Sequence, residues 1–349
     1  MCNEGDIHEA HRAAPRPAAG AAADPVTLAE VDEVRITTLV DNVYDGLLPG
    51  DETVTRAPMA TPVPAEQFVG GGTVVGLRAE HGFSALVQVR SGERTSTLLF
   101  DTGLSPEAMV DNADRLQVSF DAVQATVLSH GHFDHAGGLA GFARRRGRAG
   151  MPLTLHPNVW SRRRLTLPGA APFELPTLSM AALAAEGFEV IERRTPSLLL
   201  DGAVLITGEV DRTTEFERGM PPTHQAWDGA SWVPDPLVVD DQALVVSVRG
   251  RGLVVLTGCG HAGVVNIVRH AMRLTGVHRL AALIGGFHLG GPAFEPVIAP
   301  TVAALLGWAP GLVVPGHCTG WRAQHALAAA LPQAWRCGSS GSAYTIAAA

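Results

Sequence analysis

The chain has 349 residues, of which 46% are hydrophobic and 17% are charged, and its formal net charge is -8. This length can bury one large core or two modest ones, and we expect a single domain. The acidic balance disfavours a surface for polyanions, because contacts to phosphate groups need clustered lysine and arginine. Nucleic acid is therefore not an expected partner. Neither is a membrane, because no apolar run approaches the ~18 residues that span a bilayer.

The first 30 residues are predicted to form a disordered leader ahead of a domain over residues 31–349. The leader carries early acids and several proline, alanine and glycine residues, and it lacks the apolar stretch of a secretion signal. No pair of cysteines has the CxxC spacing, which argues against a disulfide framework or a structural zinc site. We therefore expect a cytoplasmic protein with four widely spaced cysteines, Cys2, Cys259, Cys318 and Cys337.

The domain is predicted to begin with a strand and a hairpin. Residues 34–40 are rich in β-branched side chains, which is typical of a strand, whereas prolines interrupt residues 41–64 and indicate a loop. Two apolar runs, 83–89 and 95–100, flank a short turn and predict a β-hairpin. The second run leads into the turn Asp101-Thr-Gly103.

A helix and a third strand are expected next. Ser105, Pro106 and Glu107 supply an N-cap, a proline in the first turn and an early acid, so a helix should extend to about residue 116. Residues 125–128 then form a short buried strand that ends at Ser129-His130. Open α/β sheets place their functional sites in loops at the carboxyl ends of strands, so this loop is the expected place for a site.

The second half repeats this arrangement. A hairpin, a helix and two further strands are predicted, and each of three buried strands ends in a glycine-rich loop that contains a histidine. The expected elements are strands over 243–248 and 253–257, a helix over 262–274, and strands over 280–284 and 312–314. Two halves of this kind indicate a two-sheet sandwich with helices outside.

The strongest chemical signal is the motif His130-x-His132-x-Asp134-His135. In an extended or tightly turning loop, residues two apart point the same way, so His130 and His132 can bind one ion while Asp134 and His135 turn toward a second. Imidazole and carboxylate ligands suit zinc first, with iron or manganese as alternatives. The competing interpretation is a loop of exposed or hydrogen-bonded histidines with no metal.

Several motifs resemble those of the metallo-β-lactamase superfamily, over roughly residue 34 to the C-terminus. More narrowly, they resemble a subgroup of dihydropterin ribofuranosylaminobenzene-phosphate synthase-like proteins, a dihydropteroate-synthase-related group associated with methanopterin biosynthesis. The motifs occupy residues 38–42, 101–103, 129–138, 257–263, 285–289 and 315–320. The resemblance implies an α/β fold, namely an αββα sandwich of two mixed sheets with helices outside, and a catalytic domain with two divalent metal ions.

The resemblance also implies a ligand set. His130, His132, Asp134 and His135 match the first ligand cluster, His317 matches the last ligand histidine, and His261 follows a strand end where a ligand is expected. Many relatives have a bridging aspartate where this chain has Cys259. Either Cys259 or His261 can therefore be the strand-end ligand, and His261 is favoured because a lone buried cysteine more often packs.

Other residues near the motif have open roles. No third-histidine motif precedes Asp240-Asp241, so the two metals are expected to be held unequally, with Asp241 a candidate ligand or support. Asp101 is expected to accept a hydrogen bond from a ligand histidine, or else to form the turn before Gly103. His288 is a candidate proton donor or substrate contact, or else a core residue.

The remaining histidines and the basic runs are given structural roles. His81, His156 and His224 lack a partner pattern and are expected in surface or loop positions. The runs 144–146 and 162–164 are predicted to be solvated helix faces, and the alternative is a patch that binds an anionic substrate.

Three functions fit these residues. The first is a hydrolase in which hydroxide held between two metals attacks a small, anionic ester, lactone or phosphodiester, with Asp134 essential and His288 as proton donor. The second is a transferase that condenses a dihydropterin diphosphate with an arylamine. The third is a non-catalytic ligand sensor, which the complete first ligand cluster disfavours.

Overall fold

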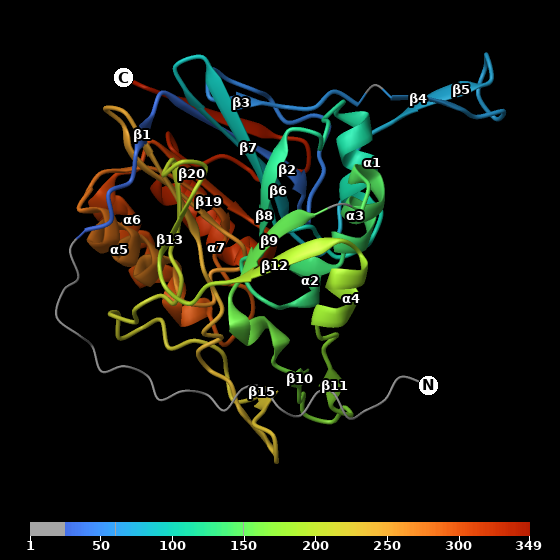
Figure 1. The fold of residues 1–349 in the computed structure, drawn as a ribbon. Helices are drawn as coiled ribbons and strands as arrows, with labels where there is room; N and C mark the ends of the chain where they lie inside the picture. The colour runs from blue at the N-terminus through green and yellow to red at the C-terminus, as the bar shows by residue number, and fades with distance from the viewer. Residues whose placement is uncertain (1–24, 60, 149) are drawn as a thin grey trace.

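The computed structural model describes residues 25–59, 61–148 and 150–349. Two β-sheets lie face to face and helices cover their outer faces (Figure 1). The first 24 residues of the predicted leader lie outside the described residues, so its boundary stays a prediction. In the part of the chain that is described, no helix is both long and apolar enough to cross a bilayer.

The first sheet is mixed and has eight strands. Its neighbours β7, β8, β9 and β12 are parallel, and the rest are antiparallel. In spatial order the strands are β12 (Phe188–Glu192), β9 (Met151–Leu155), β8 (Val123–Val127), β7 (Arg94–Phe100), β6 (Ser84–Ser91), β2 (Glu33–Val40), β21 (Ala343–Ala347) and β3 (Val54–Thr55).

The second sheet is also mixed. Its strands β18, β19 and β20 are parallel to one another, and β17 and β18 form the predicted second hairpin. In spatial order the strands are β13 (Ser197–Leu199), β14 (Val204–Ile206), β17 (Leu244–Val248), β18 (Gly252–Thr257), β19 (Leu280–Gly286) and β20 (Leu312–Gly316), with β1 (Glu30–Val31) beside β17.

The helices divide between the outer faces of the two sheets. Helices α1, α3 and α4 pack on the first sheet and α5, α6 and α7 on the second, as Figure 1 shows. Their bounds are α1 (Ala108–Arg115), α2 (Phe133–Ala136), α3 (Leu139–Arg146), α4 (Met180–Ala185), α5 (Val264–Thr275), α6 (Glu295–Trp308) and α7 (Trp321–Ala330), and 3-10 turns cover Pro157–Trp160 and His317–Thr319.

Both sheets are covered on both faces, which explains why successive residues are apolar in the buried parts of their strands. In β7, Leu98 and Phe100 point into the core between the sheets, while Leu99 points toward α1 and α3. In β18, Val254 joins the same central core and Val255 packs against α5. Successive side chains of a strand point to opposite faces, so a doubly covered sheet needs apolar residues at every position. The predicted two-sheet sandwich is therefore confirmed.

Two sequence expectations need correction. Residues 41–64 are not only loop, because they include β3 and β4 (Thr61–Pro64). The run 162–164 is not on a helix, because Arg163 and Arg164 lie in β10 (Arg163–Leu165) of a small separate sheet. That sheet has the order β11 (Phe173–Glu174), β10, β15 (His224–Trp227) and β16 (Trp232–Pro234). The run 144–146 does end a helix, α3, as predicted.

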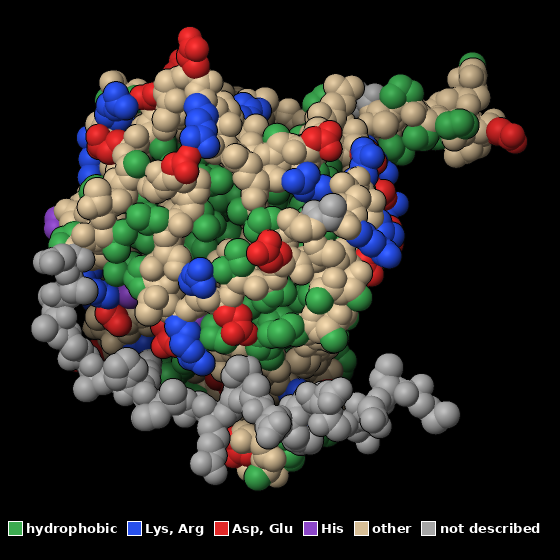
Figure 2. All heavy atoms as spheres, in the orientation of Figure 1, with side chains coloured by type: hydrophobic (Ala, Val, Ile, Leu, Met, Phe, Trp, Pro, Cys, Tyr) green, Lys and Arg blue, Asp and Glu red, His purple; other side chains and the backbone are tan. Residues whose placement is uncertain are grey.

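An arm projects from the body of the molecule. It is the antiparallel pair of β4 and β5 (Gly72–Val75), which pairs with no other described strand. Figure 2 shows hydrophobic side chains along this arm, and Phe68, Val69 and Val74 are exposed there.

The histidine motif is locked to the loop after β7 by close backbone contact. A Cβ on Gly137 would lie 1.7 Å from the carbonyl oxygen of Leu104. In contrast, a Cβ on Gly307, near the end of α6, would meet no atom within 4 Å. Gly137 therefore has no room for a side chain, and Gly307 does.

We predict that Gly137→Ala lowers the free energy of unfolding by about 1–3 kcal/mol or more, because backbone must move to accept the methyl group. Gly307→Ala is the control, and it should leave stability unchanged or raise it by up to about 1 kcal/mol. Urea denaturation of both variants measures this. Equal stability of the two variants would show that the loop is not held this tightly.

Candidate metal centre

Side chains from the ends of five strands meet at one place between the two sheets. The first sheet contributes Asp101 after β7 and the histidine motif after β8. The second sheet contributes Cys259 and His261 after β18, His288 after β19 and His317 after β20. The carboxyl ends of parallel neighbours lie at the same edge of a sheet, so the predicted convergence of these loops is what the structure shows.

A group of three imidazoles forms one half of the centre. Nε2 of His130 and Nδ1 of His132 are 3.0 Å apart, and Nε2 of His261 is 3.2 Å from each of them. All three residues are buried. Two ligands of a tetrahedral zinc ion, each at about 2.0–2.1 Å, lie roughly 3.3 Å apart, so the spacing fits one cation among the three nitrogens.

The protons on these rings are placed by contacts on their other sides. Nδ1 of His130 lies 2.9 Å from the hydroxyl of Ser129, whose own proton is donated to Asp101. Nε2 of His132 lies 3.1 Å from Nε2 of His224, whose Nδ1 donates to the carbonyl of Asp235. His130 and His132 must therefore donate outward, which leaves two nitrogen lone pairs facing each other at 3.0 Å. A cation satisfies this arrangement, and a hydrogen bond between these two rings does not.

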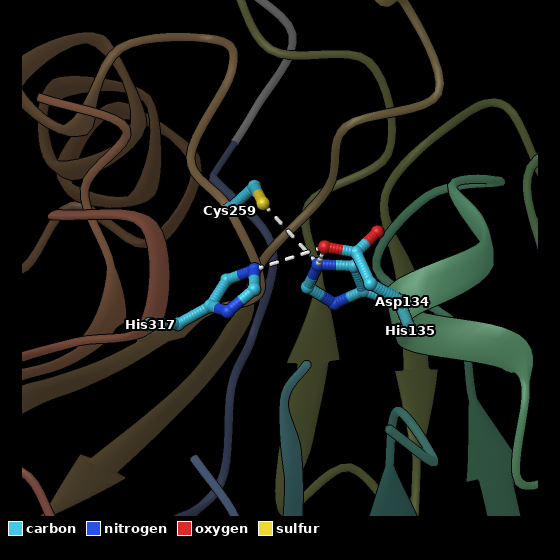
Figure 3. Close-up of side chains that lie close together, drawn as sticks. All are labelled: Asp134, His135, Cys259 and His317. Carbon is cyan, nitrogen blue, oxygen red and sulfur yellow. Dashed lines mark hydrogen bonds and ion pairs between the residues drawn. The ribbon is translucent and has the colours of Figure 1, made fainter. Parts of the chain in front are cut away.

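The second half of the centre combines a carboxylate, two imidazoles and a thiol. Asp134, His135, Cys259 and His317 offer ligand atoms that all lie within 4.8 Å of one another, and all four are buried. Figure 3 shows these side chains pointing toward a common space, Asp134 and His135 from α2 and Cys259 and His317 from two other segments. Oδ2 of Asp134 is 3.3 Å from Nε2 of His317, and Sγ of Cys259 is 3.2 Å from Nε2 of His135.

Two acceptors orient the imidazoles of this second group. Nδ1 of His135 donates to Asp101 across 2.7 Å, so Asp101 accepts a hydrogen bond from a histidine of the motif. Nδ1 of His317 donates to the amide oxygen of Asn42 across 3.0 Å. The carboxylate of the neighbouring Asp41 accepts a hydrogen bond from the backbone N–H of His317. The backbone of His317 has a positive φ of 47°. Both rings thus present Nε2 to Asp134 and Cys259.

Three residues expected at the surface or in a solvated run are buried supports. His224 is 1% exposed and contacts His132, and His156 is fully buried beside Glu209. Arg163 is 2% exposed and forms a two-pronged ion pair with Asp240, which also accepts the backbone N–H of Gly131. The signal that was missed is the strand pairing of β10 with β15, which sequence periodicity does not reveal over so few residues. His81 does lie in a loop as expected, exposed, with Nε2 3.7 Å from Asp134.

The structure brings both strand-end candidates into the centre. His261 completes the imidazole group, and Cys259 is common to all three groups of residues that could hold a metal. The third of these groups adds His288 and Cys318 to Cys259, and the ring of His288 also lies against that of His261 at a centroid distance of 4.2 Å. Asp241 belongs to none of the three groups among the described residues, and its carboxylate accepts the backbone N–H of Ala262.

Burial and charge set the protonation of the ligands. Burial lowers the pKa of His130, His132 and His261 well below the usual value, so these rings are neutral and ready for metal. Burial alone raises the pKa of the Asp134 carboxyl, but His135 and His317 outweigh it and hold this pKa below its usual range. Burial lowers the pKa of His135, but Asp134 and Asp101 outweigh it and raise the pKa to about 9.

This difference predicts that the two halves of the centre respond differently to pH. Below about pH 9, His135 carries a proton that a cation must displace, so zinc affinity of the second group should rise by up to about tenfold per pH unit toward that value and then level off. The three imidazoles of the first group should contribute no such change above about pH 7, because their pKa values are lowered. Competition with a chelator for zinc across this pH range measures both affinities. A zinc affinity of the second group that does not change with pH would contradict the assignment.

Comparisons with known proteins agree with this geometry. The family model described as "Metallo-beta-lactamase superfamily" matches residues 77–271, which include the histidine motif and the loop after β18. A solved structure described as a metal-dependent hydrolase of the beta-lactamase superfamily has a TM-score of 0.66 and 24% sequence identity, and the match covers 90% of this chain and 99% of that one. The similarity to this solved structure shows the fold alone.

Two proteins of Methanocaldococcus jannaschii are also similar. One is named 7,8-dihydropterin-6-methyl-4-(beta-D-ribofuranosyl)-aminobenzene-5'-phosphate synthase and is 29% identical over 253 residues, which is 71% of this chain and 83% of that protein. The other, uncharacterized, is 28% identical over 70% of this chain and 86% of its own length.

Proposed function

Because this chain belongs to the metallo-β-lactamase superfamily and is an enzyme of that fold, we propose that it binds two divalent cations and hydrolyses a small ester, lactone or phosphodiester. The observation that carries the proposal is the pair of lone pairs of His130 and His132, which face each other at 3.0 Å in a buried site. Nitrogen acceptors held this way are costly without a cation.

The ligand atoms divide into two sets around one shared sulfur. His130, His132 and His261 would hold one ion, and Asp134, His135 and His317 would hold the other. Cys259 contributes to either set and would take the place of a bridging carboxylate. Imidazole with thiolate favours zinc over manganese, because soft sulfur ligands select zinc, copper or iron–sulfur centres.

Bound cations would lower the pKa of a water molecule from ~15.7 toward ~7 and so supply a nucleophile at neutral pH. The chain's own groups prepare for this chemistry. The carboxylate of Asp134 stays ionised and available to orient the nucleophile. His288 lies beside His261 at the edge of the centre, and its buried Nδ1 has no hydrogen-bond partner among the described residues, so it can donate a proton to a leaving group.

A second candidate function follows from the similarity to the M. jannaschii synthase. In a transferase of that kind, the same centre would bind the diphosphate leaving group of a dihydropterin while an arylamine attacks. The residues that hold the cations are common to both functions, whereas the nucleophile, the atom that it attacks and the leaving group differ. The sensor alternative is set aside, because the chain is an enzyme of this fold.

The test uses bis(p-nitrophenyl) phosphate as a generic phosphodiester. Zinc-loaded wild-type protein should hydrolyse it, and Asp134→Asn should lower turnover at least about a hundredfold, because the amide neither binds the second ion as well nor orients the nucleophile. Asp114→Asn is the control, because Asp114 is half exposed and its carboxylate pairs with Arg145. Full turnover in Asp134→Asn would contradict the hydrolase. Product formation only when an arylamine and a dihydropterin diphosphate are supplied would select the transferase.

A further inference from the structure

A cavity of about 420 Å³ adjoins the centre on the side of His261. Its walls come from the loop before β15, the turn after β18, the end of β19 and the first turn of α6. This volume lies in the range of about 300–1,000 Å³ that is usual for small-molecule sites. His261 and His288 form the wall between the cavity and the candidate metal centre.

The cavity is lined chiefly by aromatic and aliphatic side chains. Phe216, Phe287 and Phe294 line it together with Leu289 and Val297. The ring of Phe294 stands edge-on to that of His288, with centroids 4.7 Å apart and an interplanar angle of 89°. Aromatic walls gain most from a flat aromatic ring, because such rings stack or meet edge to face in addition to burying apolar area.

Two charged residues line the cavity, and their hydrogen bonds differ. The carboxylate of Glu217 is buried and accepts the backbone N–H groups of Val265 and Asn266 and the hydroxyl of Thr214. It therefore caps the start of α5. Arg218 is exposed, and Nε donates to the carbonyl of Glu215, while its terminal nitrogens make no contact with the described residues. Arg218 is therefore the charged lining residue that can still pair with a ligand.

The geometry points to a substrate subsite for a planar aromatic group that carries an anionic substituent. The ring would lie among the phenylalanines, the anionic substituent would pair with Arg218, and the reacting bond would be directed past His288 toward the cations. This inference rests on the proposed function, because it assigns the cavity to the substrate of that centre. It adds the class of substrate, which the ligand set does not determine.

The test measures binding by calorimetry, with no turnover needed. We expect zinc-loaded protein to bind 2-naphthoate at least about tenfold more tightly than adamantane-1-carboxylate, whose carboxylate is the same but whose body is not flat. Val297→Trp, which fills the cavity, should remove this difference. Leu306→Trp is the control, because Leu306 is on the same helix and is 50% exposed. If Val297→Trp does not fold, Phe294→Leu, which keeps the bulk and removes the ring, should reduce the difference.

Arg218→Gln tests the charge. It should weaken the binding of 2-naphthoate by at most about fivefold, as expected for an exposed ion pair, and leave the binding of neutral 2-naphthalenemethanol unchanged. Arg193→Gln is the control, because Arg193 is likewise exposed and donates to the backbone carbonyl of Glu192. Equal binding of the two carboxylates, or unchanged naphthoate binding in the filled variant, would overturn the inference. Cavity-dependent binding without hydrolysis would leave the inference standing and count against the hydrolase.

Discussion

The buried lone pairs of His130 and His132 are the constraint around which this structure is built. The two nitrogens lie 3.0 Å apart, and the N–H of each ring donates to a group on the side away from the other ring. His261 adds a third nitrogen at 3.2 Å from both. Folding brings these groups together from segments more than a hundred residues apart, so the cost of unpaired buried acceptors must be offset by a ligand or by the rest of the fold.

Much of the surrounding structure serves to hold that arrangement. Asp101 orients His135, Asn42 orients His317, and Asp240 fixes the backbone of Gly131 between the first two histidines. Asp240 is itself paired with the buried Arg163 of the small sheet. A buried ion pair adds little net stability, but removal of one partner is costly, about 3–5 kcal/mol. Through Arg163 and Asp240, the small sheet therefore helps to hold the loop of the histidine motif in place.

The sequence predicted the parts of this site that depend on local pattern. Apolar strands followed by glycine and histidine located the loops after β8, β18, β19 and β20, because strand ends and tight turns have short-range signatures. The contact of Asp101 with His135 also followed, since it joins a turn to the neighbouring strand's loop. The resemblance to a known family supplied the assignment of His261 and His317, from the second half, to the same ligand set as the histidine motif.

What could not be predicted depends on long-range pairing of short segments. Arg163 looked like part of a solvated run, but alternation in a three-residue strand buries it against Asp240. His224 had no motif, yet strand β15 places it against His132. The sequence also leaves open whether Cys259 or His261 reaches the centre, because Cys259 stands where many relatives have a bridging aspartate. The turn Gly258-Cys259-Gly260-His261 lets both do so, one toward each half.

Zinc content is the most direct test of the claim that two groups of ligands form two cation sites. Protein dialysed against zinc and then against buffer should retain about two ions per chain by elemental analysis, as a dinuclear centre requires. His261→Ala and His317→Ala should each retain about one, because each removes a ligand from a different group. His325→Ala, an exposed histidine of α7, should match the wild type. Wild-type protein without zinc, or variants that all retain the wild-type amount, would contradict the account.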